Sequence, residues 1–134
     1  MNETDRRNKN LVLIQYLNSI INGFKVKAEY STNDNDIKAI VVQETSGQKI
    51  VFYDNDNPLY NYFNVEIFGA NIEEEYKTSA KIGDLIGKSI YLDFQNQKWQ
   101  IIFKQYSNPR TIQYYDIRRV SYIMTLQVII NRIA

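Results

Sequence analysis

The C-terminal stretch Arg119–Arg132, RVSYIMTLQVIINR, decides the fold. Apolar residues recur there at every second position from Val120 to Ile130, and most of the positions between them are polar. This period of two is that of a β-strand with one apolar face. Since a typical strand has about 5–6 residues, the pattern predicts an unusually long strand that can serve as the spine of a sheet.

Two residues of this stretch break the alternation. Ile123 and Ile129 are apolar where the pattern places the polar face. Apolar side chains on an otherwise polar face indicate a surface that is covered in the working protein. We therefore expect this face of the sheet to meet another subunit or another layer.

The amino-acid composition excludes several kinds of chemistry. The chain has 134 residues, 44% of them hydrophobic, and a net charge of +1, which predicts one globular domain over residues 1–134 and gives no sequence-wide reason to expect nucleic acid. Cysteine and histidine are both absent. The chain therefore has no disulfides, no thiol nucleophile and neither of the commonest side chains for base catalysis and transition-metal binding.

The N-terminal region carries no targeting pattern. Residues 1–5 are polar and are expected to be flexible, and the apolar run Leu11–Ile14 is too short for the core of a signal peptide. No run approaches the ~20 apolar residues of a membrane-spanning helix. We expect a soluble chain inside the producing cell.

Tyrosine occurs 11 times. Its large apolar body and polar tip suit surfaces that become buried on assembly. Tyrosine is also simply common in strands, so the count alone leaves both interpretations open.

The first half of the chain is predicted to hold one helix and several strands. Apolar residues at spacings of three and four predict a helix over 6–22, with Gly23 as its C-cap. Period-two runs and turn residues then predict strands over 24–30, 37–43, 49–53 and 62–68, separated by turns at 31–36, 44–48 and 54–61.

Two acidic turns resemble the opening of a calcium loop. They are Asp34–Asp36 and Asp54–Asp56. Neither continues as an EF-hand, because no glycine stands at the sixth position and the twelfth positions are Thr45 and Val65. Asparagine and aspartate are also ordinary turn residues, so no metal site is predicted.

A second helix is expected from Glu74 or Thr78 to Ser89. The acidic run Glu73–Glu75 suits a helix start. Gly83 and Gly87 lie four residues apart, which would leave a smooth ridge for close packing. Alternatively, the helix is short or broken at Gly87.

The C-terminal half is expected to add further strands. After a turn at 93–98, extended segments are predicted over 99–106 and 111–117, with a loop at 107–110 between them. The arginines around them, beside several tyrosines, could contact nucleic acid, or equally form salt bridges at the rim of a protein interface.

No catalytic constellation stands in the sequence, and no phosphate-binding loop or nucleophile elbow is present. The chain is therefore expected not to be an enzyme and to bind no cofactor. Runs of strands interrupted by single helices predict an α+β domain, a mixed and mostly antiparallel sheet with two helices on one face.

The order of these elements resembles a known family. It runs through the strand YFNVEIFG, the acidic-started helix EEEYKTSAKIGDLIG, the hairpin KWQIIFKQYSNPRTIQYYD and the closing strand RRVSYIMTLQVIIN. In its length and in the order of its helices and strands, the chain resembles the tail-terminator, or tail-completion, proteins of long-tailed bacteriophages and the related minor capsid proteins. The Gly83/Gly87 pair and the two Asp/Asn turns do not match the family.

The resemblance implies a structural virion protein, assembled in the host cytoplasm. It would form a hexameric ring at the head-proximal end of the tail tube, stop tube polymerisation and join the tail to the head connector or stopper, with DNA only passing through the lumen. The alternatives are another head–tail connector component, or a small cytosolic module that binds protein or nucleic acid. The residues expected at the ring interfaces are Tyr60, Tyr62, Arg110, Tyr114, Tyr115, Arg118 and Arg119.

Overall fold

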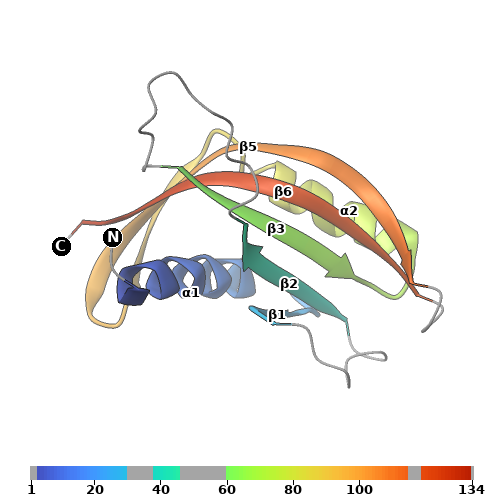
Figure 1. Ribbon diagram of the computed structural model, residues 1–134, viewed down its shortest axis with the longest axis horizontal. Helices are drawn as coiled ribbons and strands as arrows, with labels where there is room; N and C mark the ends of the chain where they lie inside the picture. The colour runs from blue at the N-terminus through green and yellow to red at the C-terminus, as the bar shows by residue number, and fades with distance from the viewer. Residues whose placement is uncertain (1–2, 30–37, 46–59, 115–118, 134) are drawn as a thin grey trace.

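The computed structural model describes residues 3–29, 38–45, 60–114 and 119–133. These residues form two helices and six strands (Figure 1). In chain order they are α1 (Glu3–Ile20), β1 (Lys25–Lys27), β2 (Ala39–Glu44), β3 (Tyr60–Phe68), α2 (Ile72–Gly83), β4 (Ser89–Phe94), β5 (Gln97–Tyr114) and β6 (Arg119–Arg132). The predicted α+β class is confirmed.

The sheet has the strand order β1-β2-β3-β6-β5-β4. Only β1 and β2 pair in parallel, and every other neighbouring pair is antiparallel. The C-terminal strand β6 lies between β3 and β5, and the long strands arch over α1 (Figure 1). The predicted long strand is thus confirmed, and it is central in the sheet.

Both helices pack on the same face of this sheet, which we call the helix face. The even-numbered residues of β6 from Tyr122 to Ile130 point into the core on this side and are all buried. Cross-strand register places Phe63, Val65 and Ile67 of β3 beside them. The helices contribute buried side chains to the same cluster, namely Val12, Leu13, Ile14, Leu17, Ile21, Ile82 and Leu85.

The helix boundaries differ from those predicted. α1 begins three residues earlier than position 6 and ends at Ile20, and Gly23 has the positive φ of 84° that a C-cap residue takes. α2 spans Ile72–Gly83, so the prediction that it continues to Ser89 was wrong. Gly87 has a φ of 89°, a left-handed conformation that ends a helix rather than extending it.

Strand β4 was not predicted. Its alternating residues Ile90, Leu92 and Phe94 pack against the core, whereas the predicted second helix extended to Ser89, the first residue of this strand. The predicted turn after it is confirmed. Gln95 and Asn96 have φ values of 52° and 63°, as in the two-residue turns that suit the twist of a hairpin.

The predicted loop at 107–110 is also wrong. β5 runs without interruption from Gln97 to Tyr114, and its register against β6 shifts between Phe103 and Gln105 and again between Ser107 and Arg110. Such shifts are bulges, where extra residues enter one strand. Pro109 lies in the second shift, and proline is tolerated in a sheet at a bulge or an edge.

The remaining strands differ in length from the predictions. β1 is shorter than the predicted strand at 24–30. β2 begins two residues after position 37 and ends one residue after position 43, and β3 begins two residues before position 62. The predicted strand at 49–53 lies outside the described residues, as do the turn at 31–36, most of the turn at 44–48 and all but the last two residues of the turn at 54–61.

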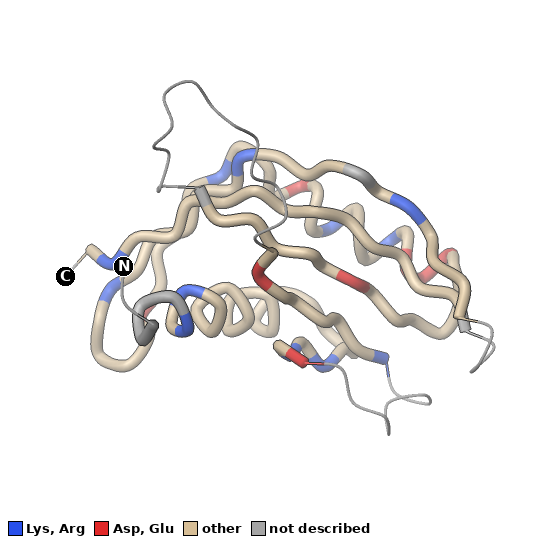
Figure 2. The backbone as a smooth tube through the Cα atoms, in the orientation of Figure 1, with Lys and Arg blue, Asp and Glu red and all other residues tan. Residues whose placement is uncertain are grey.

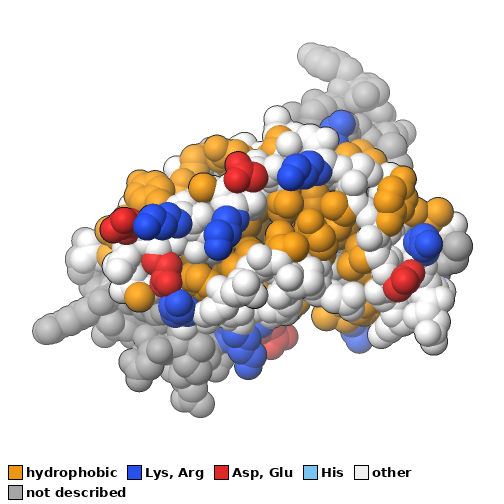
Figure 3. All heavy atoms as spheres, turned by 180° about the vertical axis from the view of Figure 1, so that it is seen from behind, with side chains coloured by type: hydrophobic (Ala, Val, Ile, Leu, Met, Phe, Trp, Pro, Cys, Tyr) orange, Lys and Arg blue, Asp and Glu red, His pale blue; other side chains and the backbone are white. Residues whose placement is uncertain are grey.

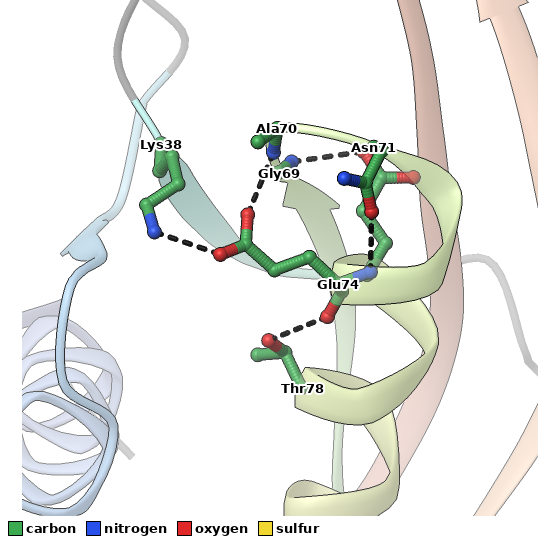
Figure 4. A network of polar contacts seen from close by, with 7 residues as sticks. Lys38, Gly69, Ala70, Asn71, Glu74 and Thr78 are labelled. Atoms are coloured by element: carbon green, nitrogen blue, oxygen red, sulfur yellow. Dashed lines mark hydrogen bonds and ion pairs between the residues drawn. The ribbon is translucent and has the colours of Figure 1, made fainter.

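Polar contacts at the start of α2 fix this helix to the sheet (Figure 4). Asn71 caps the helix by accepting a hydrogen bond from the backbone N–H of Glu74 at 2.8 Å. The Glu74 carboxylate accepts from Ala70 N at 2.7 Å and from Lys38 Nζ, next to β2, at 2.8 Å. These contacts, the Ala70 N–H first and Lys38 second, lower the pKa of Glu74.

The turn before α2 is tight because Glu75 lies directly against Gly69. The backbone N–H of Gly69 donates to Glu75 Oε2 at 2.8 Å. A Cβ on Gly69 would lie 2.9 Å from Glu75 Cγ, closer than carbon atoms approach without displacement. The predicted acidic helix start is confirmed, and its carboxylates serve to dock the helix.

Candidate assembly surface

The opposite side of the sheet, which we call the outer face, carries most of the residues predicted to form interfaces. It is built from the odd-numbered residues of β6 and their cross-strand partners. Along β3 these partners are Tyr60, Tyr62, Asn64 and Glu66, and along β5 they are Ile102, Gln105, Ser107, Arg110, Ile112 and Tyr114.

Register brings these predicted residues onto one surface from three strands. Tyr62 is half-buried opposite Gln127, Arg110 is exposed opposite Ile123, and Tyr114 pairs with Arg119. Tyr60 occupies the outer-face position opposite Ile129. Tyr115 and Arg118 lie outside the described residues.

The predicted residues do not form one contiguous cluster on this face. Tyr62 and Arg110 face β6 residues four positions apart, or roughly 13 Å at ~3.3 Å per residue. The outer face therefore has a tyrosine end near Tyr62 and an arginine end near Arg110.

Ile123 modifies one expectation. Its side chain is only 6% exposed, so within a single chain it is already covered, and it does not by itself require a second subunit. Ile129 is half-buried on the same face.

A buried carboxylate lies at the arginine end. Glu66 is 1% exposed on the outer face, and its Oε2 accepts hydrogen bonds from Tyr114 Oη and Ser121 Oγ, both at 2.5 Å. Hydrogen bonds from hydroxyl groups to a carboxylate are short and strong. The three residues, which we call the Glu66 cluster, join β3, β6 and the end of β5.

The Glu66 cluster changes the acidity of Tyr114. Burial, followed by the hydrogen bond to Glu66 and the negative charge of that carboxylate, raises the pKa of Tyr114 from 10.0 to about 12. A deprotonated tyrosine would lose its donor proton and stand beside a second negative charge.

This shift predicts a pH dependence of stability. In the unfolded chain Tyr114 loses its proton near pH 10, whereas in the folded chain it keeps the proton to about pH 12. Unfolding therefore releases a proton in this window, and the stabilising contribution, which is complete below pH 10, is lost as pH rises to about 12. We expect urea unfolding from about pH 9 to 11 to show a steeper loss of stability for the wild type than for Tyr114→Phe. Equal slopes would contradict the assignment, because the other tyrosines are common to both proteins.

Polar contacts continue along the outer face towards its tyrosine end. Thr125 Oγ1 donates to Asn64 Oδ1 at 3.1 Å, and Gln127 Nε2 donates to Tyr62 Oη at 3.3 Å. Such cross-strand pairs stabilise a sheet. They also leave a surface of hydroxyl and amide groups, with few charges, across three strands.

In the described part of the chain no group of three or more His, Cys, Asp or Glu side chains is placed to hold a metal ion. Both Asp/Asn turns that resemble calcium loops, at 34–36 and 54–56, fall outside that part. None of the described helices is long and apolar enough to cross a membrane.

Sequence reasoning missed Glu66 and Ser121 as members of this surface. Both stand at polar positions of alternating strands, where a solvent-exposed side chain is the ordinary expectation. A glutamate flanked by Val65 and Ile67 in a buried central strand is the feature that could have marked it, since such strands seldom carry a charge without a partner.

Comparison with known protein families finds no family model that matches this chain, and a comparison with curated proteins finds no match either.

Proposed function

We propose that this protein is a structural component of a bacteriophage virion, a tail-terminator-like subunit that assembles with copies of itself into a ring at the head-proximal end of a tail tube. In this role it stops tube polymerisation and presents a docking surface to the head connector. DNA passes through the ring without being read.

The observation that carries this proposal is the composition of the outer face. Protein interfaces are depleted of lysine and glutamate and enriched in tyrosine and arginine. No charged residue occurs in β6 between its terminal arginines (Figure 2). The one charged residue of β3, Glu66, is buried. Part of the outer face is buried within the chain, but its half-buried positions on β3 and β6 also carry no charge; they are Tyr62, Asn64, Gln127 and Ile129.

The shape of the domain is compatible with ring assembly. Both helices cover one face of the sheet, and the exposed and half-buried positions of the outer face, such as Arg110 and Tyr62, together with the sheet edges, are available for contacts with neighbouring subunits. A head-to-tail contact between two different patches closes into a ring when its rotation allows. Arg110 and Tyr62, at the two ends of the outer face, are the side chains we assign to such contacts.

Charge reversal at Arg110 tests the proposal. We expect wild-type protein to form a ring-sized oligomer in light scattering and negative-stain images, alone or with a tail tube protein. Arg110→Glu should shift the population to smaller species. Lys77→Glu is the matched control, because the ion pair of Lys77 with Glu73 is exposed on the helix face and contributes little.

Three results would count against the proposal. Wild-type protein that stays monomeric with and without a tube protein would exclude a ring. Rings of Arg110→Glu that equal those of the wild type would exclude the outer face as the interface. A salt-dependent shift of DNA by micromolar protein would favour a nucleic-acid-binding module instead.

A further inference from the structure

The second half of β5 is an edge strand in the described part of the chain. β4 pairs with β5 only as far as Ile102, and Phe103 then exchanges backbone hydrogen bonds with Lys88 O and Gly87 N. No described strand lies beyond this point on that side of the sheet.

Several backbone groups along this edge point away from β6. Phe103 directs its N–H and C=O outward, and in an antiparallel ladder the direction alternates from one register pair to the next. Phe103 lies opposite an even-numbered residue of β6, Val128, and the same holds after the two bulges for Tyr106, Thr111 and Gln113. The backbone N–H and C=O groups of these three residues therefore also point away from β6. Among described residues none of these three makes a backbone hydrogen bond to a further element.

A groove runs beside this edge between α2 and β5. It has a volume of about 340 Å³ and is lined by Tyr76, Ser79, Ala80, Gly83, Asp84, Tyr106, Tyr122 and Met124. Tyr76 and Tyr106 are 52% and 47% exposed, so both rings present apolar surface at the groove.

Small residues of α2 keep the groove open. Ser79, Ala80 and Gly83 form its helical wall. A Cβ on Gly83 would lie 3.5 Å from Tyr106 Cε1, an ordinary contact, so glycine is not required here by the fold. A longer side chain at this position would instead fill the space between α2 and Tyr106.

The exposed charges near the C-terminal end of α2 and near Phe103 are mostly positive. Lys81, Lys88 and Lys104 are exposed, and none has a carboxylate partner within the described residues. Asp84 is the single carboxylate that lines the groove. On the reverse side of the molecule, Lys and Arg side chains, with some Asp and Glu side chains between them, lie beside the hydrophobic surface (Figure 3).

We propose that the groove and the free edge of β5 together bind an extended, acidic segment of another protein. The segment adds a strand to β5 through the outward backbone groups. Its alternate side chains lie on the helix face, where one apolar or aromatic side chain enters the groove between Tyr76 and Tyr106. Its carboxylates lie near the three lysines. This site is separate from the outer face and does not depend on ring assembly.

The test uses a yeast-displayed library of random eight-residue peptides, selected against the full chain. We expect enrichment of peptides that alternate β-branched or aromatic residues with carboxylates. Thr111→Pro removes an outward N–H, and Gly83→Leu fills the groove, so each should weaken the selected peptides by about tenfold or more. Thr111→Val and Gly83→Ala are the matched controls and should bind like the wild type.

Urea unfolding of each variant separates loss of binding from loss of fold. If Thr111→Pro fails to fold, Gly83→Leu decides alone, because a Cβ at Gly83 has ordinary contacts. Enrichment of no peptides, or of basic ones, would overturn the proposal, as would binding that is indifferent to Gly83→Leu. Self-association that Gly83→Leu abolishes, without peptide binding, would assign the groove to a second copy of this chain and overturn the acidic partner. Failure of the Arg110 test would leave these outcomes unchanged.

Discussion

Replacing Leu126 by alanine should lower the free energy of unfolding by about 2–5 kcal/mol. Leu126 is fully buried at the middle of β6, opposite Phe63 on one side and Tyr106 on the other. Truncation removes apolar contacts and leaves a cavity that the flanking strands cannot close, since both are held by their ladders. Urea unfolding, with the midpoint and the m-value fitted separately, measures the loss.

The neighbouring position provides the control. Gln127 is half-buried on the outer face, and its amide donates to Tyr62 Oη at 3.3 Å. Gln127→Ala should therefore cost about 1 kcal/mol or less. If Gln127→Ala were the more destabilising of the two, the assignment of the even-numbered side chains to the core would be wrong.

This contrast shows why the last strand could be predicted from sequence. Its even positions are apolar without exception from Val120 to Ile130, and a strand whose two faces meet different surroundings must alternate in this way. The central place of β6 in the sheet does not follow from its length, because β5 is longer and lies nearer the edge of the sheet.

The errors arose where tertiary contacts decide between two local structures. From the sequence, Ile90 fits the apolar face of a helix as well as a strand. Gly87 is compatible with a weak helix in the sequence, but in the structure its left-handed φ ends the helical path. Ser107–Arg110 has the composition of a loop, but its partners across the sheet, Thr125 and Ile123, keep it in the ladder with a bulge. That this segment is a bulged strand and not a loop becomes visible only from its pairing with β6.

The candidate surface could be predicted in part for the same reason. Tyr62, Arg110 and Tyr114 were chosen from local sequence, and register alone places them on one face. The Glu66 cluster joins residues 48 and 55 positions apart in the chain, and no local pattern predicts such a pairing.

Replacing Glu66 by alanine should cost about 3 kcal/mol. The carboxylate accepts from both Tyr114 and Ser121 in a place where Ser121 is fully buried. Alanine leaves these hydroxyl groups without their acceptor, and a buried unsatisfied group costs its full desolvation energy. Glu66→Gln is the control, because the amide oxygen still accepts a hydrogen bond, and its cost should be about half as large.

A double-mutant cycle assigns this cost to the cluster itself. Glu66→Ala and Tyr114→Phe should be non-additive by about 1–2 kcal/mol, since Phe at position 114 removes a donor that needs the carboxylate. Additive losses would show that Glu66 stabilises the fold through other contacts.

Because the Glu66 cluster joins the end of β5 to β3 and β6, its loss should also loosen the strand that carries Arg110. Hydrogen exchange of backbone amides should then rise at 110–114 more than along β4 in Glu66→Ala, and exchange that rises uniformly would indicate global destabilisation alone.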